Sequence, residues 1–290
     1  MTASQTATGP AINVFVEGVG LLGPGLPGWP SSRDALAGLA AYQPARSVLP
    51  LPMTLPPAER RRAGMVVKVS LAVAGEAVAD SGLQASSLAS VFTSSSGDAV
   101  NCHEICSALA SNDRLISPTR FHNSVHNASS GYWSISSGAM ATSSVLCARD
   151  ASFSAGLLEA MTQVAVDGIA VLLVAYDTAY PEPLNTVRPL PDTFGIALVL
   201  SPKQSVHSLA QWSLDPARCF TERAPDTMDN LTLEDIRLGI PAARGLPLMQ
   251  WLAAEKSGEA VVDYLCGKQL AVQVKHLRSP FAEPAPSDDA

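Results

Sequence analysis

The chain has 290 residues, a formal net charge of −7, and 47% hydrophobic residues. This length can form one sizeable α/β core, and the acidic balance argues against a nucleic-acid partner, because phosphates are bound by Lys and Arg. No apolar run reaches the roughly 20 residues of a membrane-spanning helix, and the N-terminus lacks a signal-peptide pattern. The sequence therefore predicts a cytoplasmic protein without a membrane span.

The hydrophobic pattern alternates between strand and helix along the chain. Apolar runs bounded by turn residues indicate strands, and apolar stripes at a spacing of three or four residues indicate helices. The expected elements are, in chain order, a strand at 12–20, a Pro-rich extended connection at 43–57, a helix at 58–80, a strand at 88–96, a helix from the cap Asp98 to about 110, a helical region at 117–137, a strand at 140–147, a helix at 152–166, strands at 168–177 and 194–202, a helix at 246–254, and strands at 259–265 and 269–275.

The order of these elements predicts the fold class. Strands that alternate with helices favour a layered α/β fold, and the apolar run GIAVLLVAYD (168–177) is typical of a strand covered on both faces. A Pro/Asp-rich stretch at 215–230 is expected to separate the strands from the last helix. We expect one domain over 12–276, between a flexible N-terminus (1–11) and a disordered tail (277–290).

Cysteine usage indicates reduced thiols. The five cysteines are odd in number and form no CxxC pair, so most are expected to be small core residues. Two of them would share one face of the helix after Asp98, where core packing is favoured over metal or redox chemistry. The cysteines are Cys102, Cys106, Cys147, Cys219 and Cys266.

One segment has the pattern of a nucleophile site. In SSVLCARDASFSAGLLEA (143–160), a strand leads into Cys147, a sharp turn follows, and a helix begins within a few residues. A helix N-terminus stabilises a nearby thiolate, which would make Cys147 nucleophilic. A small buried cysteine between a strand and a helix is the more common alternative.

A second segment combines imidazoles, amides and aromatic rings. Histidines at i and i+4 can bind zinc on a helix, but no third ligand follows at a suitable spacing, so we predict no metal and no cofactor. Because aromatic residues and buried amides suit subunit interfaces, we favour a polar network packed against a partner, with internal core as the alternative. Its residues are Phe121, His122, Asn123, Val125, His126, Asn127, Tyr132 and Trp133.

Six motifs carry a resemblance to a known family. They resemble the short β-ketoacyl synthase-like proteins found in aryl polyene and xanthomonadin-type pigment clusters, members of the thiolase-like superfamily, over most of residues 12–276. The motifs are LLGPGLPGW near the start, VFTSSSGD at 91–98, SPTRFHNSVHNASSGYWSI at 117–135, SFSAGLLEA at 152–160, FGIALVLSP at 194–202 and IPAARGLPLMQWLA at 240–253.

The resemblance implies a fold and a partner. The fold would be the N-terminal half of the thiolase-like α/β/α/β/α architecture, in which the strand before the nucleophile pairs with its counterpart across a two-fold axis. Here that strand lies near residues 140–146, and its edge would be bare in a monomer. We therefore expect a heterodimer with a full-length catalytic ketosynthase, with Met140, Thr142 and Ser144 in the interface.

The chain departs from the catalytic pattern that the resemblance implies. Active ketosynthases use two histidines in glycine- and threonine-rich motifs of their C-terminal half, and none of the five histidines here lies in such a motif. Arg149 and Asp150 stand where active members have small residues beside the nucleophile. Cys147 matches the nucleophile position, but we expect no catalysis by this chain alone.

Three hypotheses follow for the function. The first is a non-catalytic, chain-length-factor-like subunit in polyene pigment biosynthesis, which stabilises the ketosynthase, shapes its acyl tunnel, and meets the acyl carrier protein mainly through that partner. The second is an acyltransferase or condensing enzyme that uses Cys147 itself. The third is a homodimeric acyl-binding protein.

Overall fold

The computed structural model describes residues 11–265 and 267–277, so nearly all of the predicted flexible N-terminus and disordered tail lies outside the described residues. None of the helices in these ranges combines the length and apolar character needed to cross a bilayer. The strands and α-helices are β1 (Ile12–Leu22), α1 (Trp29–Leu36), α2 (Pro57–Arg62), α3 (Met65–Ser81), β2 (Ala89–Thr93), α4 (Ala99–Ala110), α5 (Pro118–Ser124), α6 (Ala128–Ser137), β3 (Ser143–Leu146), α7 (Ser152–Asp167), β4 (Val171–Asp177), α8 (Leu184–Val187), β5 (Phe194–Ser201), β6 (Ala210–Leu214), β7 (Phe220–Thr221), α9 (Leu231–Gly239), α10 (Leu246–Ala253), β8 (Gly258–Asp263) and β9 (Gln269–His276).

The strands of the described ranges form one nine-stranded mixed sheet. Its order is β3-β2-β4-β5-β1-β6-β9-β7, with β8 paired to β9. Strands β3 and β4 both run parallel to β2, whereas β5 is antiparallel to its neighbours β4 and β1. Strand β3 is therefore the edge strand of the parallel part, and β2 is its one partner within the described residues.

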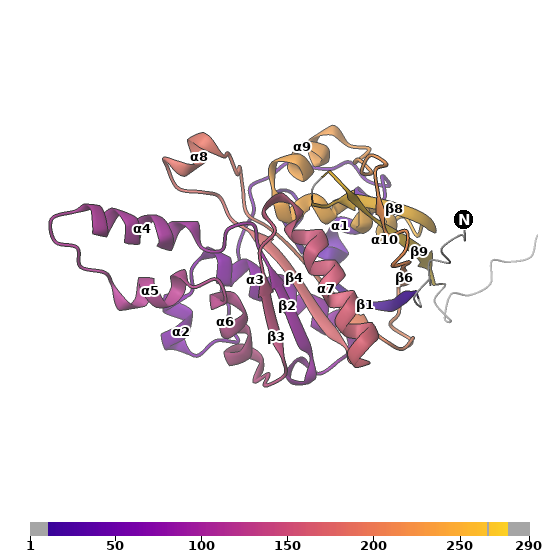
Figure 1. The fold of residues 1–290 in the computed structure, drawn as a ribbon, viewed down its shortest axis with the longest axis horizontal. Helices are drawn as coiled ribbons and strands as arrows, with labels where there is room; N and C mark the ends of the chain where they lie inside the picture. Colours follow the sequence, from indigo (N-terminus) through magenta and orange to yellow (C-terminus); the bar gives the residue numbers. More distant parts are fainter. Residues whose placement is uncertain (1–10, 266, 278–290) are drawn as a thin grey trace, which may run out of the picture.

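Helices cover both faces of the sheet, with α7 in front of the strands in Figure 1 and α3 on the opposite face. Successive residues of β4 belong alternately to two apolar clusters. Leu173 packs in the cluster that contains residues of α7, and Leu172 packs in the cluster that contains residues of α3. All seven residues of β4 are buried. This confirms the prediction of a strand covered on both faces and gives an α/β/α layering.

The predicted helix at 58–80 is in fact two helices, α2 and α3. Gly64 has an extended backbone, with φ −72° and ψ −179°, and this interrupts the helical hydrogen bonds. The stripe expected from residues three or four positions apart, which includes Val66, Ser70 and Ala74, is buried, but Val69 and Val73 on other faces of α3 are buried as well. The reason is a very close approach to the sheet: a Cβ added at Gly20 of β1 would lie 1.9 Å from the Val73 carbonyl oxygen.

Other elements were not predicted. Helix α1 follows the Gly/Pro-rich loop, and its first amide, from Trp29, donates to Glu76 Oε1 of α3 at 2.8 Å. Helix α9 and strand β7 lie near or within the stretch expected to be irregular, where Asn230 caps α9 by accepting the amide of Thr232 at 3.0 Å. The preceding β6 completes the sheet between β1 and β9. These segments are short, so their local apolar patterns are weak signals, although β6 alternates buried and partly exposed residues as a strand does.

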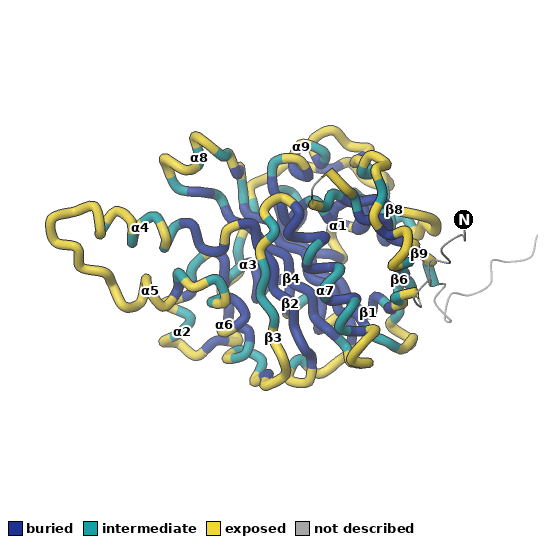
Figure 2. The backbone as a smooth tube through the Cα atoms, viewed as in Figure 1, coloured by how far each residue is buried: buried dark blue, intermediate teal, exposed yellow. Residues whose placement is uncertain are grey.

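Helices α4 and α5 project from the body of the molecule (Figure 1) and are largely exposed (Figure 2). Asp98 caps α4 as predicted, because its side chain accepts the amide of Asn101 at 2.9 Å. Ala99 is the one buried residue of α4, and Cys102 and Cys106 are exposed. The expectation that most cysteines are core residues is therefore wrong: among the four described cysteines only Cys219 is buried, because α4 leaves the body and β3 ends at the surface.

Candidate functional site

Three parallel strands end together at one edge of the sheet. The loop Ser94–Ser95 follows β2, Cys147 follows β3, and Asp177 ends β4. Ligand sites of open α/β sheets lie at the carboxyl ends of parallel strands, because the loops that follow several strands converge there. This cluster is therefore the place to look for chemistry.

Asp177 is the centre of the cluster. Its Oδ1 accepts the Ser95 amide at 2.9 Å and the Ser95 hydroxyl at 2.7 Å, and its Oδ2 accepts the Ala242 amide at 2.8 Å. Complete burial raises the pKa of Asp177 to about 6, although these hydrogen bonds act in the opposite direction. The carboxyl group thus ties the loop after β2 to the short helical turn Pro241–Gly245 before α10. Sequence reasoning missed this residue, whose one signal is an acidic side chain that ends an apolar strand.

Cys147 is exposed, and its thiol donates a hydrogen bond to the Ser95 carbonyl oxygen at 3.0 Å. The predicted order of strand, cysteine, turn and helix is confirmed. The amides at the turn have other partners, however: Ala148 N–H donates to Ser152 Oγ at 3.0 Å, and Ala151 N–H donates to the Ala148 carbonyl at 3.0 Å. The Cys147 sulfur therefore faces a backbone carbonyl oxygen, and neither of these two amides donates to it.

Two charged side chains, those of Arg149 and Asp150, follow Cys147 after one alanine. Arg149 adopts a left-handed backbone, with φ 52°, and is exposed. Asp150 forms an ion pair with Arg188 Nη2 at 2.5 Å, and the guanidinium of Arg188 lies 5.8 Å from the ring centre of Tyr180. The segment after the thiol is therefore charged and tethered to the loop that contains α8.

No histidine in the described ranges is hydrogen-bonded to Cys147. His122 packs edge-on against Tyr132 with ring centres 6.4 Å apart, and His276 is 3.5 Å from Glu255. Both ring nitrogens of His126 are buried without a hydrogen-bond partner, and its ring lies near Gly97.

The residues predicted for a partner interface fall into two groups. Asn123, Tyr132 and Trp133 are buried in this chain: Tyr132 donates to Asn123 Oδ1 at 3.0 Å, and Asn123 Nδ2 donates to the Arg62 carbonyl at 2.9 Å. They hold α5 and α6 to the α2–α3 segment, as the internal-core alternative describes. The residues with exposed or partly exposed side chains are Phe121, His122, Val125, His126, Asn127, Met140, Thr142 and Ser144.

Comparison with protein families identifies the chain. The family model described as β-ketoacyl synthase, N-terminal domain, matches residues 34–240. The chain therefore belongs to this family, and its fold is the thiolase-like α/β fold of the ketosynthase N-terminal domain. None of the curated proteins matches the sequence.

Solved structures with a similar fold include three from ketosynthase assemblies. A chain of the ketosynthase ApeO in complex with its chain length factor ApeC, from Xenorhabdus doucetiae, is 21% identical with a TM-score of 0.67, covering 90% of this chain and 99% of that one. The ishigamide ketosynthase/chain length factor gives 10% identity, a TM-score of 0.66 and coverage of 92% and 100%. The AntDE:AntF complex of a type II PKS acyl carrier protein with its ketosynthase contains a chain that is 12% identical, with a TM-score of 0.68. The match covers 91% of this chain and 99% of that one.

Proposed function

We propose that this chain is a non-catalytic, chain-length-factor-like subunit that pairs with a catalytic ketosynthase. The observation that carries the proposal is the environment of Cys147, whose thiol donates to a backbone carbonyl. Thioester condensation needs a thiolate nucleophile and donors near the developing oxyanion. In the described residues no histidine is hydrogen-bonded to Cys147, and the amides of Ala148 and Ala151 donate to other groups, so we assign the chemistry to the partner.

The similar structures support a paired assembly. The three chains just described are matched over almost their whole length, and each comes from a complex that contains a ketosynthase. A domain of the same extent and fold is suited to the same kind of assembly. The family membership of this chain agrees with that role.

The surface beside Cys147 supports the same role. Strand β3 has an open edge in the described chain, and an unpaired edge favours continuation of the sheet by a partner. Met140, just before β3, is 94% exposed, and Phe121 on α5 is 61% exposed. We place the interface on the β3 edge, with Thr142 and Ser144, and on the outer side of α5. The buried residues Asn123, Tyr132 and Trp133 would support this surface from within.

Co-expression with the ketosynthase from the same source tests the pairing. A stable mixed complex should elute as one species in size-exclusion chromatography. The double variant Phe121→Glu/Met140→Glu should weaken it at least tenfold, because two charges would be buried. The matched control, Val206→Glu/Leu231→Glu, changes two similarly exposed apolar residues elsewhere and should leave the complex intact. Persistent homodimers without a mixed complex would instead support the homodimeric acyl-binding protein.

We further propose that the pair extends a polyene chain held on an acyl carrier protein, and that this subunit shapes the acyl tunnel. This finer assignment rests on the resemblance to aryl polyene proteins. In the reconstituted pair, Cys147→Ala should leave the condensation of an acyl primer with malonyl-carrier protein unchanged, as followed by mass spectrometry of the β-ketoacyl-carrier protein that forms with release of CO2. Replacing the partner's nucleophile should abolish elongation. Loss of elongation in Cys147→Ala would favour the alternative in which Cys147 acts itself.

A further inference from the structure

Helix α4 carries two exposed cysteines on one face. Cys102 and Cys106 are four positions apart in a helix of 12 residues, so their side chains lie one turn above the other. Both are exposed, although free cysteine is among the residue types most often buried. Core packing, which the sequence favoured, therefore does not explain this pair, and the function proposed above makes no use of it.

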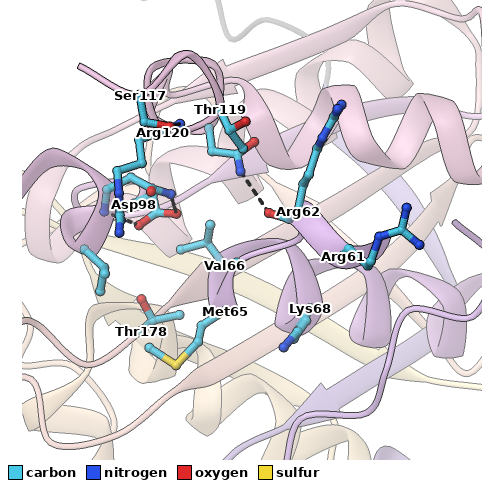
Figure 3. Close-up of a pocket in the computed structure, with 14 residues that line it drawn as sticks. Arg61, Arg62, Met65, Val66, Lys68, Asp98, Ser117, Thr119, Arg120 and Thr178 are labelled. Carbon is cyan, nitrogen blue, oxygen red and sulfur yellow. Dashed lines mark hydrogen bonds between the residues drawn. The ribbon is translucent and has the colours of Figure 1, made fainter. Parts of the chain in front are cut away.

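The pair is distinct from the two groups of residues nearest to it. Asp98, at the start of α4, lines a cavity together with Arg62 and Arg120 (Figure 3), and neither cysteine of α4 is among the residues that line it. Cys147, the other exposed thiol of the described residues, follows β3 and donates to the Ser95 carbonyl oxygen. The thiols of α4 are therefore a separate pair.

A disulfide between the two thiols does not fit the helix. The Cβ atoms of residues four apart in a helix are roughly 5–6 Å from each other, whereas those of a disulfide are about 3.8 Å apart. The pKa of the Cys102 thiol is raised, first by partial desolvation and then by the negative charges of Asp98 and of the Cys106 thiolate. A protonated thiol reacts slowly with oxidants. Oxidation would therefore distort α4 and start from the slow form.

A bridging metal ion fits the spacing better. Two sulfurs on opposite sides of one ion lie about 4.6 Å apart when each metal–sulfur bond is about 2.3 Å long, which side chains on adjacent turns can span. Within the described ranges no group of three or more His, Cys, Asp or Glu residues could hold a metal ion. Zn²⁺ takes four ligands in structural sites, so this pair suits instead the soft ion Cu(I), which thiolates select.

We propose that Cys102 and Cys106 together bind one soft monovalent metal ion of the Cu(I) type. Each thiol releases its proton to solvent and forms one sulfur–metal bond, so one ion replaces two protons and no electron is transferred. The bridge joins two turns of a helix that buries only Ala99 and is marginal by its length. Metal binding therefore orders α4. The proposal is independent of the role of Cys147.

Competition with the Cu(I) chelator bicinchoninate tests the site in the full chain, without oxygen and with a reductant. The unaltered chain should take one Cu(I) from the coloured chelator complex, and added Zn²⁺ should not displace it. Cys102→Ser and Cys106→Ser should each abolish the transfer, whereas Cys147→Ala should leave it unchanged. Amide hydrogen exchange in α4 should slow when Cu(I) binds the unaltered chain, and should not change in Cys106→Ser.

A matched control keeps the number of thiols on α4. Cys106→Ser/Ser107→Cys moves one thiol by about 100° around the helix axis at an exposed position, and it should also lose the transfer. Equal transfer by this variant would mean that the thiols act singly, which would overturn the proposal. A chain that takes up no Cu(I), or that binds one ion between two copies, would overturn it as well. Circular dichroism establishes that each variant is folded before titration.

Discussion

The centre of the sheet and the flank made of α4, α5 and β3 are built differently. In the centre, β4 and β5 are buried on both faces by α3 and α7. In the flank, α4 buries only its first residue and exposes Leu109. A helix of 12 residues is marginal on its own in water. The chain therefore buries its apolar residues in the centre, where they stabilise the fold, and exposes some of them in the flank. The proposed partner would cover the exposed ones.

The largest expected effect comes from opening a cavity in the centre. Leu173 on β4 is fully buried, so Leu173→Ala should lower the free energy of unfolding by about 4 kcal/mol. The same change at Leu109 on α4, which is 49% exposed, should cost less than about 0.5 kcal/mol in the isolated chain. Urea unfolding followed by circular dichroism measures both. Equal losses would mean that the flank contributes to folding as much as the centre does.

The close contact between β1 and α3 should give the next largest effect. In Gly20→Ala the new methyl group would meet the backbone carbonyl of Val73, and the helix must move, which should cost about 3 kcal/mol. The control Gly75→Ala lies on the exposed side of α3 with nothing near its added Cβ, and should stabilise the helix by about 0.5–1 kcal/mol. Thermal unfolding of the two variants should therefore shift in opposite directions.

A smaller effect is expected where the centre meets the candidate site. Asp177→Asn keeps the side-chain volume but turns one acceptor into a donor, so an amide of Ser95 or Ala242 loses its partner. At pH 7 this should cost about 2 kcal/mol. The exposed Asp167→Asn, at the end of α7, should change stability by less than about 0.5 kcal/mol.

The pH dependence of stability gives a second readout for Asp177. Its pKa is raised to about 6 in the folded chain, above the value near 4 of an unfolded chain. The folded state therefore binds this proton more tightly, and stability should fall as pH rises from about 4 through 6. Between pH 5 and pH 7 the contribution is about 1 kcal/mol. Asp177→Asn should remove this contribution. If urea unfolding gives the same change in the free energy of unfolding between pH 5 and pH 7 for the variant and for the unaltered chain, the raised pKa does not belong to Asp177.

The interface prediction from the 117–135 motif shows how far residue type can lead. The aromatic and amide residues suggested contact with a partner, yet Tyr132 and Asn123 bond to each other inside the chain. Phe121, only two positions before Asn123, is exposed. Positions two apart on a helix lie on nearly opposite sides of it, and only the placement of α6 against α3 decides which side is interior.

The sequence by itself determined the elements whose signals are local. The two-sided strands at 168–177 and 194–202, the cap at Asp98, and the order of strand, Cys147 and helix all depend on residues a few positions apart. Only the tertiary structure decided which groups meet, as Ser95 and Asp177 do across 82 positions of sequence. The exposure of α4 was likewise decided by the tertiary structure. Burial and hydrogen bonding between distant segments depend on how whole layers pack, and local periodicity carries no information about that.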